Sequence, residues 1–251
     1  MHATLLGRLV GRPMWLVGNV LDGVGYLFQF LALRRGSLTL VEPLFVLMLV
    51  FALPAAAWMD HRRIAKSEWI PTVVIAGGLA LFLRVARPGL GHPTASDEAW
   101  VILSAVIAAV CGVLVVASRR GRSRASAVLQ AAGSGAAFGY VAAVTERTGH
   151  LLNGGLLHTL ESWEPYALLV GGTVALLLTQ GAYNAGSLHL SLPTMTVAQP
   201  LVAAAIGLAM FGEEISTTGA APYLEVLGLL LVLSGVFTIS RSTMIAPEHT
   251  A

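Results

Sequence analysis

Residues 99–118 read AWVILSAVIAAVCGVLVVAS, an uncharged and mostly apolar run that begins after Glu98 and ends before Arg119. A helix rises about 1.5 Å per residue, so about 20 such residues cross the roughly 30 Å of hydrocarbon in a bilayer. Polar and apolar residues do not alternate along the run, which excludes a strand of a transmembrane barrel. The run therefore predicts a membrane-spanning helix.

The composition of the whole chain gives the same result. Of its 251 residues, 56% are hydrophobic and 11% are charged, and the mean hydropathy is +0.77. Soluble domains carry about a quarter of charged residues, so this chain has too little polar surface to be one. The charges also gather in short runs, at 34–35, 60–66 and 119–124. We predict an all-α, polytopic transmembrane helix bundle that forms a single transmembrane domain over residues 1–251.

Eight spans are predicted from the apolar runs. They cover residues 14–33, 38–59, 69–86, 99–118, 125–146, 166–188, 192–211 and 223–240. Ten of the fifteen Lys and Arg residues lie on the side of the N-terminus. Cytoplasmic loops carry an excess of these residues, so both termini are predicted to be cytoplasmic.

The basic residues are nearly all arginine, which is typical of a GC-rich bacterial genome, so we expect the inner membrane of a bacterial cell. The net charge is only +2, and the basic residues lie at the ends of apolar runs. Orientation in the membrane explains them, and no nucleic-acid partner is expected.

No motif in the sequence predicts an enzyme. The single cysteine, Cys111, lies inside an apolar run, so neither a disulfide nor a cysteine metal site is expected. The longest outer loop contains His150, His158, Glu161 and Glu164, but their spacing matches no known ligand set, and we expect an interfacial loop. A nucleophile elbow, a paired metal-ligand helix motif and a phosphate loop are all missing. The prediction is a protein that is not an enzyme and has no cofactor.

An internal repeat is visible in the sequence. Residues 32–40 read ALRRGSLTL, and residues 182–190 read AYNAGSLHL. Each is followed by a polar residue before Pro-Leu, at 42–44 and at 199–201. Chance similarity in a sequence rich in Leu and Ala is the alternative explanation.

The repeat units cover approximately residues 14–86 and 166–240, and the helices at 99–118 and 125–146 join them. The copies lie five spans apart, and an odd offset inverts the second copy relative to the first. Inverted repeats are the architecture of many secondary transporters, whose substrate site lies near the midplane between the copies.

Two of the predicted spans carry a stripe of polar residues, which would suit a shared aqueous cavity. At 100° per residue, the stripe of the first span covers an arc of about 80°. Its members are Asn19, Asp22, Tyr26 and Gln29. The stripe of the sixth span covers about 60°. Its members are Thr173, Gln180, Asn184 and Ser187, with Tyr183 alongside. Hydrogen bonds that hold helices together are the other explanation of such stripes.

Asp22 and Glu42 are the ionisable residues that lie well inside the predicted spans. A carboxylate at the centre of a span costs roughly 2.5–3.5 kcal/mol, so Asp22 is predicted to serve transport. Glu42 lies one turn from the start of its span, where it could equally reach the interface. Glu42-Pro43 and Gln199-Pro200 are predicted weak points, because an interior proline frees a carbonyl one turn earlier. Glu213-Glu214 is interpreted as a solvated edge.

These features together resemble the drug/metabolite transporter superfamily, in its EamA-like and NIPA-like branches. The residues that carry the resemblance are RPMWL at 12–16, the segment 32–44 with its final Glu-Pro-Leu, GGL at 77–79, the segments 182–190 and 199–201, FGE at 211–213 and the segment 228–235. The resemblance implies two inverted five-helix halves, or nine helices in the NIPA-like branch. The first helix of this chain is similar to the third of ten or the second of nine. One or two N-terminal helices are therefore expected to be missing, through a start codon assigned downstream or in a natural short form.

The leading hypothesis is a secondary transporter that moves a small solute by alternating access. Asp22 would carry the coupling proton or cation. The predicted substrate- or ion-binding residues are Asp22, Tyr26, Gln29, Glu42, Gln180, Tyr183, Asn184 and Gln199. One alternative is a transporter of a magnesium-like divalent cation, with Asp22 and Glu42 as oxygen ligands. Another is a membrane scaffold without transport. The expected partners are the lipid bilayer, the solute or ion, and a second copy of the chain in a homodimer.

Overall fold

The computed structural model describes residues 13–48, 50–51, 54, 61, 66–86, 95–120, 123–185, 188–213 and 219–240. Every regular element in these ranges is a helix, so the all-α prediction is confirmed for them. The helices are α2 (Pro13–Leu33), α3 (Leu38–Leu44), α5 (Lys66–Ala86), α6 (Asp97–Arg120), α7 (Ser123–Leu151), η1 (Leu152–Gly154), α8 (Leu156–Glu161), α9 (Glu164–Asn184), α10 (Leu188–Met210) and α11 (Ala221–Ser240).

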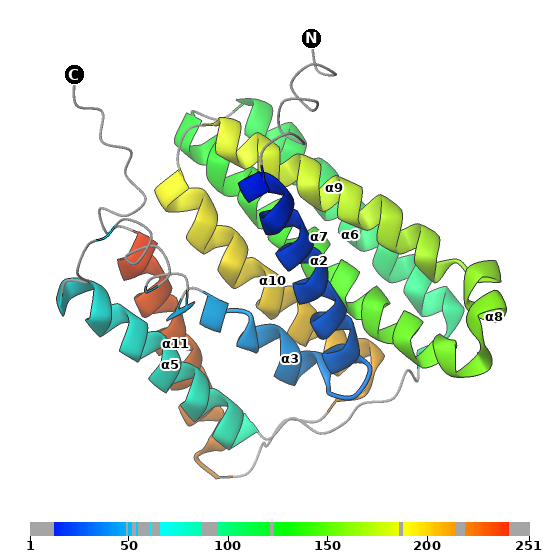
Figure 1. Cartoon of the computed structure of the whole chain (residues 1–251), viewed down its shortest axis with the longest axis horizontal. Coiled ribbons are helices and arrows are strands. Elements are labelled where there is room, and N and C mark those ends of the chain that lie inside the picture. The colour runs from blue at the N-terminus through cyan, green and yellow to red at the C-terminus, as the bar shows by residue number, and fades with distance from the viewer. Residues whose placement is uncertain are drawn as a thin grey trace.

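Six helices are long and apolar enough to cross a membrane: α5, α6, α7 with the turn after it, α9, α10 and α11. The chain is therefore a multi-pass membrane protein. Within one apolar stretch of 18 residues in each helix, 11% of the residues are buried in α6, which contains the run quoted first, and 72% are buried in α7. α7 is thus a central helix and α6 a peripheral one (Figure 1). The exposed apolar side chains of α6 suit contact with lipid.

Glycines allow α10 to approach α7 closely. A Cβ atom added at Gly135 would lie 2.9 Å from the carbonyl oxygen of Met195, and one at Gly139 would lie 2.8 Å from that of Gln199. Both distances are too short for a real side chain. Close backbone approach through small residues is the usual way in which helices pack in a membrane.

α5 and α11 form an antiparallel pair at one side of the molecule (Figure 1). A Cβ atom at Gly78 would lie 2.8 Å from the carbonyl oxygen of Gly228, and a Cβ atom at Gly228 would lie 2.9 Å from that of Gly78. Gly235, further along α11, meets Pro71 near the start of α5. The order of contacts is reversed along the two helices, so they run in opposite directions.

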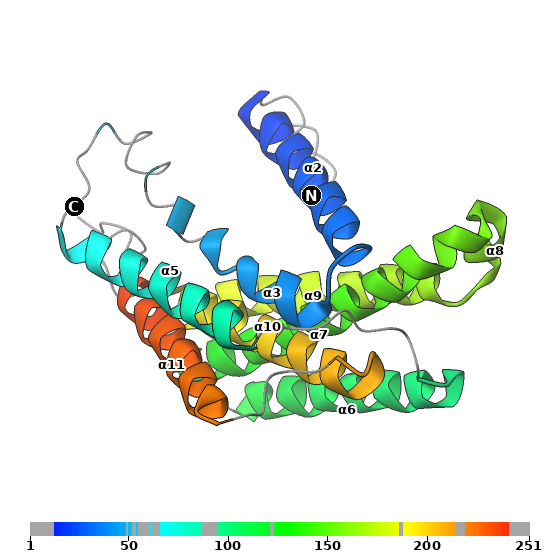
Figure 2. The ribbon, with the colours of Figure 1, turned by 90° about the horizontal axis from the view of Figure 1, so that it is seen from below.

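α2 leans away from the layer that contains α7, α9 and α10 (Figure 2). It reaches α7 through Tyr26, whose hydroxyl lies 3.3 Å from that of Thr145. Beyond its end, Arg34 donates a hydrogen bond of 2.7 Å to Asn153. Much of the rest of α2 is exposed and apolar, as at Val20 and Phe28.

α3 is short because of the proline inside it. Pro43 has no N–H to donate to the carbonyl one turn earlier, and the chain tightens after it. Phe45 bonds to the carbonyl of Glu42 at 3.0 Å and Val46 to that of Pro43 at 3.1 Å, both three residues back. The predicted span 38–59 begins with α3, but most of residues 49–60 lie outside the described ranges.

Candidate functional site

A buried carboxylate joins three helices at the centre of the candidate site. Glu42, on α3, is fully buried. Gln29 of α2 donates from Nε2 to its Oε1 at 3.1 Å, and Gln199 of α10 donates from Nε2 to its Oε2 at 2.9 Å. Each carboxylate oxygen therefore receives one amide donor. We call these three residues the Glu42 junction.

Prolines next to two of these residues weaken the helices at the same place. Pro43 follows Glu42, and Pro200 follows Gln199. Because Pro200 has no N–H, it cannot bond to the carbonyl of Thr196 one turn earlier on α10. Thr196 lines the cavity described next. The two predicted weak points, Glu42-Pro43 and Gln199-Pro200, therefore meet at the Glu42 junction, where Glu42 and Gln199 share a hydrogen bond.

A cavity of about 740 Å³ adjoins the Glu42 junction, between α2, α7, α9 and α10. Gln29 and Gln199 line it, and so do Tyr26, Thr145 and Tyr183. The hydroxyl of Thr145 donates to a backbone carbonyl at 2.7 Å, so in the contact between Tyr26 and Thr145 the tyrosine is the donor. Mostly apolar walls with a few polar groups are typical of a binding site for a small organic molecule.

Two predicted site residues lie elsewhere on α9. Gln180 and Asn184 are exposed and are not among the residues that line the cavity. The lining face of α9 runs instead through Gly172, Leu176 and Tyr183. At 100° per residue, Gln180 and Asn184 fall about 40° and 80° to one side of Leu176. The polar stripe and the lining face therefore coincide only at Tyr183, and the structure does not bring Gln180 and Asn184 into the site.

Asp22 lies on α2, one turn before Tyr26, but its side chain is outside the described part of the chain. Its predicted role as the proton or cation carrier stays a prediction.

Glu213 has a structural role that the sequence did not indicate. It is buried, and it accepts hydrogen bonds from the backbone N–H groups of Leu38 at 2.6 Å and Thr39 at 2.9 Å, and from the Thr39 hydroxyl. Gly212, at a φ of 61°, turns the chain back after α10. The interpretation of Glu213 as a solvated edge is therefore wrong: the turn brings its carboxylate to the unpaired N–H groups in the first turn of α3.

Glu146 was also missed by the reasoning from sequence. It was placed at the last position of the predicted span 125–146, but α7 continues to Leu151, which leaves Glu146 inside the bundle and 1% exposed. Its Oε2 has no hydrogen-bond partner among the residues that the structure describes. The polar residues at 147–150 suggested a loop, but the helix continues through them to Leu151. Gly155, at a φ of 106°, lies closer to the helix end.

A second polar cluster joins α6, α7 and α9 at one end of the bundle. Arg147 contacts Asp97 at 2.5 Å and Glu164 at 2.7 Å, and its guanidinium lies 5.2 Å and 5.4 Å from the rings of Trp100 and Trp163. The predicted interfacial loop therefore contributes a buried carboxylate, Glu164, to the packing. Within the described ranges, no group of three His, Cys, Asp or Glu side chains is placed to hold a metal ion.

The comparisons with known proteins give one relative. No family model matches the chain, and no solved structure matches it. The chain is 31% identical over 242 residues to the "Uncharacterized protein Cgl0250/cg0304" of Corynebacterium glutamicum, and the alignment covers 95% of this chain and 83% of that protein. At this identity and coverage, the chain belongs to the same family as the Corynebacterium protein.

Proposed function

We propose that the protein is a secondary transporter that moves a small organic solute by alternating access. The observation that carries the proposal is the Glu42 junction beside a cavity of about 740 Å³. The junction links α2, α3 and α10 through the side chains of Gln29, Glu42 and Gln199. Pro43 weakens α3 and Pro200 weakens α10 at this place. A change in the contacts of a bound solute with Gln29 or Gln199 would therefore alter the link between these helices.

An inverted repeat is part of the proposal. A two-fold axis in the membrane plane would bring equivalent residues of the two copies together and make equivalent helices antiparallel. Glu42 and Gln199 hold equivalent positions in the predicted repeat, and they share a hydrogen bond. α5 and α11 are also equivalent, and they pack antiparallel through Gly78 and Gly228, each against the carbonyl of the other.

These contacts support eight spans, with α2 as the first and the segment that begins with α3 as the second. They also agree with the resemblance to the drug/metabolite transporter superfamily, so we propose an EamA-like protein of the bacterial inner membrane with both termini in the cytoplasm.

The cavity lining indicates the chemistry of the solute. Six lining residues have side chains that can hydrogen-bond: Tyr26, Gln29, Thr145, Tyr183, Thr196 and Gln199. The other described lining residues are apolar or glycine. None of the described lining residues is a carboxylate, Lys, Arg or His. The proposed substrate class is an uncharged organic molecule with an apolar or aromatic body and one or two hydrogen-bonding groups.

The hydrogen bonds of the Glu42 carboxylate favour an organic solute over a divalent cation. Both of its oxygens accept amide N–H groups, at 3.1 Å and 2.9 Å. A magnesium-like ion prefers oxygen ligands and keeps several waters, but none of the described residues that line the cavity is a carboxylate, and Glu42 is fully buried beside it.

Uptake into proteoliposomes tests the proposal. The protein is reconstituted, and a panel of uncharged aromatic and amphipathic solutes is screened for accelerated counterflow of the labelled compound. Gln29→Leu and Gln199→Leu are expected to reduce counterflow of the best solute at least tenfold. Gln180→Leu, the same change on the exposed face of α9, is expected to leave it unchanged.

Three results would contradict the proposal. Equal counterflow in all three variants would remove the Glu42 junction from the mechanism. Counterflow of Mg²⁺ alone would favour the cation. If no solute moves and thiols introduced by Gln29→Cys and Gln199→Cys, in a Cys111→Ser background, resist a water-soluble maleimide, the scaffold reading replaces the transporter.

A further inference from the structure

Three buried glutamates come together from segments far apart in the sequence. They are Glu42 on α3, Glu146 on α7 and Glu213 after α10, with exposed fractions of 0%, 1% and 4%. Their neighbours Val41, Val144 and Phe211 belong to one buried hydrophobic cluster. Glu146 lies within electrostatic range of both other carboxylates. Three negative charges in such a place would repel each other strongly.

The three carboxylates differ in their hydrogen bonds. Glu213 accepts bonds from two backbone N–H groups and a hydroxyl. Glu42 accepts one amide N–H at each oxygen. Glu146 alone of the three has a buried oxygen, Oε2, without a partner in the described part of the chain. Donors therefore stabilise the charged form of Glu213 and Glu42, whereas an anionic Glu146 would have an unsatisfied, desolvated oxygen.

Two cationic side chains near Glu146 are engaged with other residues, and Arg35, between α2 and α3, is exposed. Arg147, next in the chain, binds Asp97 and Glu164. Arg34, which packs against Gly149 on α7, donates to Asn153. His150 lies one turn further along α7 and has an interaction of its own. A proton on Glu146 is the direct way to remove its charge.

Resting on the transport function proposed above, we propose that Glu146 is the residue that binds the coupling proton. Water supplies the proton, an O–H bond forms at Oε2, and release returns the proton to water. With the proton bound, α3 packs between α7 and the turn after α10. Without it, a new negative charge faces Glu42 and Glu213 and weakens that packing. Because Glu42 ties α2 to α10, the charge on Glu146 controls the helices around the cavity.

Infrared spectroscopy of the reconstituted protein tests this site without any solute. The pH is titrated, and the carbonyl stretch of a protonated, buried carboxylic acid is followed in H₂O and D₂O. We expect such a band in the wild type, its loss in Glu146→Gln and its full retention in Glu161→Gln, a matched change at an exposed glutamate of α8. Glu146→Gln resembles the protonated side chain in shape and charge, so it should fold; a melting curve in detergent checks this. His150→Gln removes the neighbouring imidazole, so a carboxyl band that titrates in this variant as in the wild type does not depend on the titration of His150.

Two results would overturn the proton site. One is the absence of a protonated carboxyl band in the folded wild type. The other is a band that survives in Glu146→Gln or disappears in Glu42→Gln instead.

The proton site and the transport function fail in different ways. Once a solute is identified, Glu146→Gln should abolish uptake driven by a pH gradient but keep solute counterflow within twofold of the wild type. A titrating band without any counterflow would reject transport alone, and counterflow without the band would reject the proton site alone.

Discussion

At the scale of single residues, the protein depends on a few buried polar contacts between segments that are distant in sequence. Glu42 and Gln199 are 157 residues apart, and their hydrogen bond is 2.9 Å long. Arg147 and the 2%-exposed side chain of Glu164 form another buried polar contact, at 2.7 Å, between α7 and α9. Breaking a buried contact leaves a polar group without water or partner, which costs more than the contact itself contributes.

Loss of one of the two acceptor oxygens of Glu42 should therefore destabilise the folded protein. In Glu42→Gln one of the two oxygens becomes an NH₂ group, which cannot accept a bond from the facing glutamine. We expect a loss of about 1–3 kcal/mol in the free energy of unfolding, the cost of an unsatisfied buried group. Denaturation in mixed micelles measures it. Glu161→Gln, the same exchange at an exposed glutamate of α8, is the control; an equal loss there would contradict the prediction.

The Arg147 side chain should contribute much more to the free energy of unfolding than the side chain of its exposed partner Asp97. Removing the cation by Arg147→Ala leaves the carboxylate of Glu164 buried and uncompensated, which typically costs about 3–5 kcal/mol. The side chain of Asp97 is 78% exposed, so Asp97→Ala should cost less than about 1 kcal/mol. Unfolding curves of both variants in the same detergent check this order, and similar losses would contradict it.

The local sequence predicted some of these residues but not their contacts. Gln29, Glu42, Tyr183 and Gln199 were candidates because each is polar within an apolar run. Nothing local to those runs indicates which of them meet. The same limit explains the error at Glu213, because its burial depends on a turn that returns the chain to α3.

At the scale of helices, the predicted spans follow the observed ones closely where the apolar run and the helix end together. The span 69–86 corresponds to α5, Lys66–Ala86, and 192–211 to α10, Leu188–Met210. The difference is larger for 125–146, because α7 continues to Leu151. Polar residues at the end of a run suggest a loop, but a helix continues while its backbone groups remain paired.

Glycine determines the packing of α5 on α11, and two adjacent glycines provide a matched test. Gly78→Ala would place a Cβ atom 2.8 Å from the carbonyl oxygen of Gly228, whereas a Cβ atom at Gly77 has no heavy atom within 4 Å. We expect Gly78→Ala to lose about 1–3 kcal/mol, as overpacking does. Gly77→Ala should be neutral or gain up to about 1 kcal/mol from helix propensity. Melting temperatures in detergent measure both, and equal shifts would contradict the role of Gly78.

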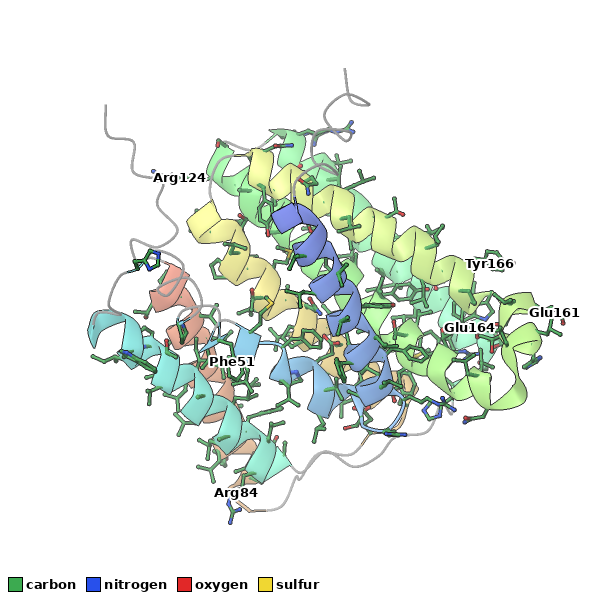
Figure 3. All side chains as sticks on the ribbon, in the orientation of Figure 1. Phe51, Arg84, Arg124, Glu161, Glu164 and Tyr166 are labelled. Atoms are coloured by element: carbon green, nitrogen blue, oxygen red, sulfur yellow. The ribbon has the colours of Figure 1, made fainter. Side chains whose placement is uncertain are left out.

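At the scale of the whole molecule, the two ends of the bundle differ. Arg124 lies at one end, and Glu161, Glu164 and Tyr166 lie near the other (Figure 3). Glu146 belongs to the half of the bundle on the side of Glu164, since Arg147 binds Glu164 and follows Glu146 directly. Glu213 lies in the same half, since Met210, just before it, accepts a hydrogen bond of 3.3 Å from Ala95, just before α6. The proposed proton site is therefore close to the end that the arginine count predicts to face away from the cytoplasm.

The orientation can be measured with two exposed positions. In a Cys111→Ser background, the thiol of Glu161→Cys should react with a membrane-impermeant maleimide in intact spheroplasts. The thiol of Arg124→Cys should react only after the membrane is permeabilised, because loops rich in Arg stay in the cytoplasm. Labelling in the reverse order would invert the topology, and labelling of both positions in intact cells would contradict the number of spans between them.

Two properties of this protein can be predicted from its sequence: the chain is helical, and it crosses a membrane several times. Both properties are local: an uncharged run of sufficient length partitions into hydrocarbon, and its backbone groups must then pair within the segment. Tertiary structure alone decided that Glu42 lies between two glutamines, that Glu146 is buried without a partner among the described residues and that Gln180 lies outside the cavity. These outcomes depend on how closely helices approach each other, and that is set by glycines and turns from different parts of the chain acting together.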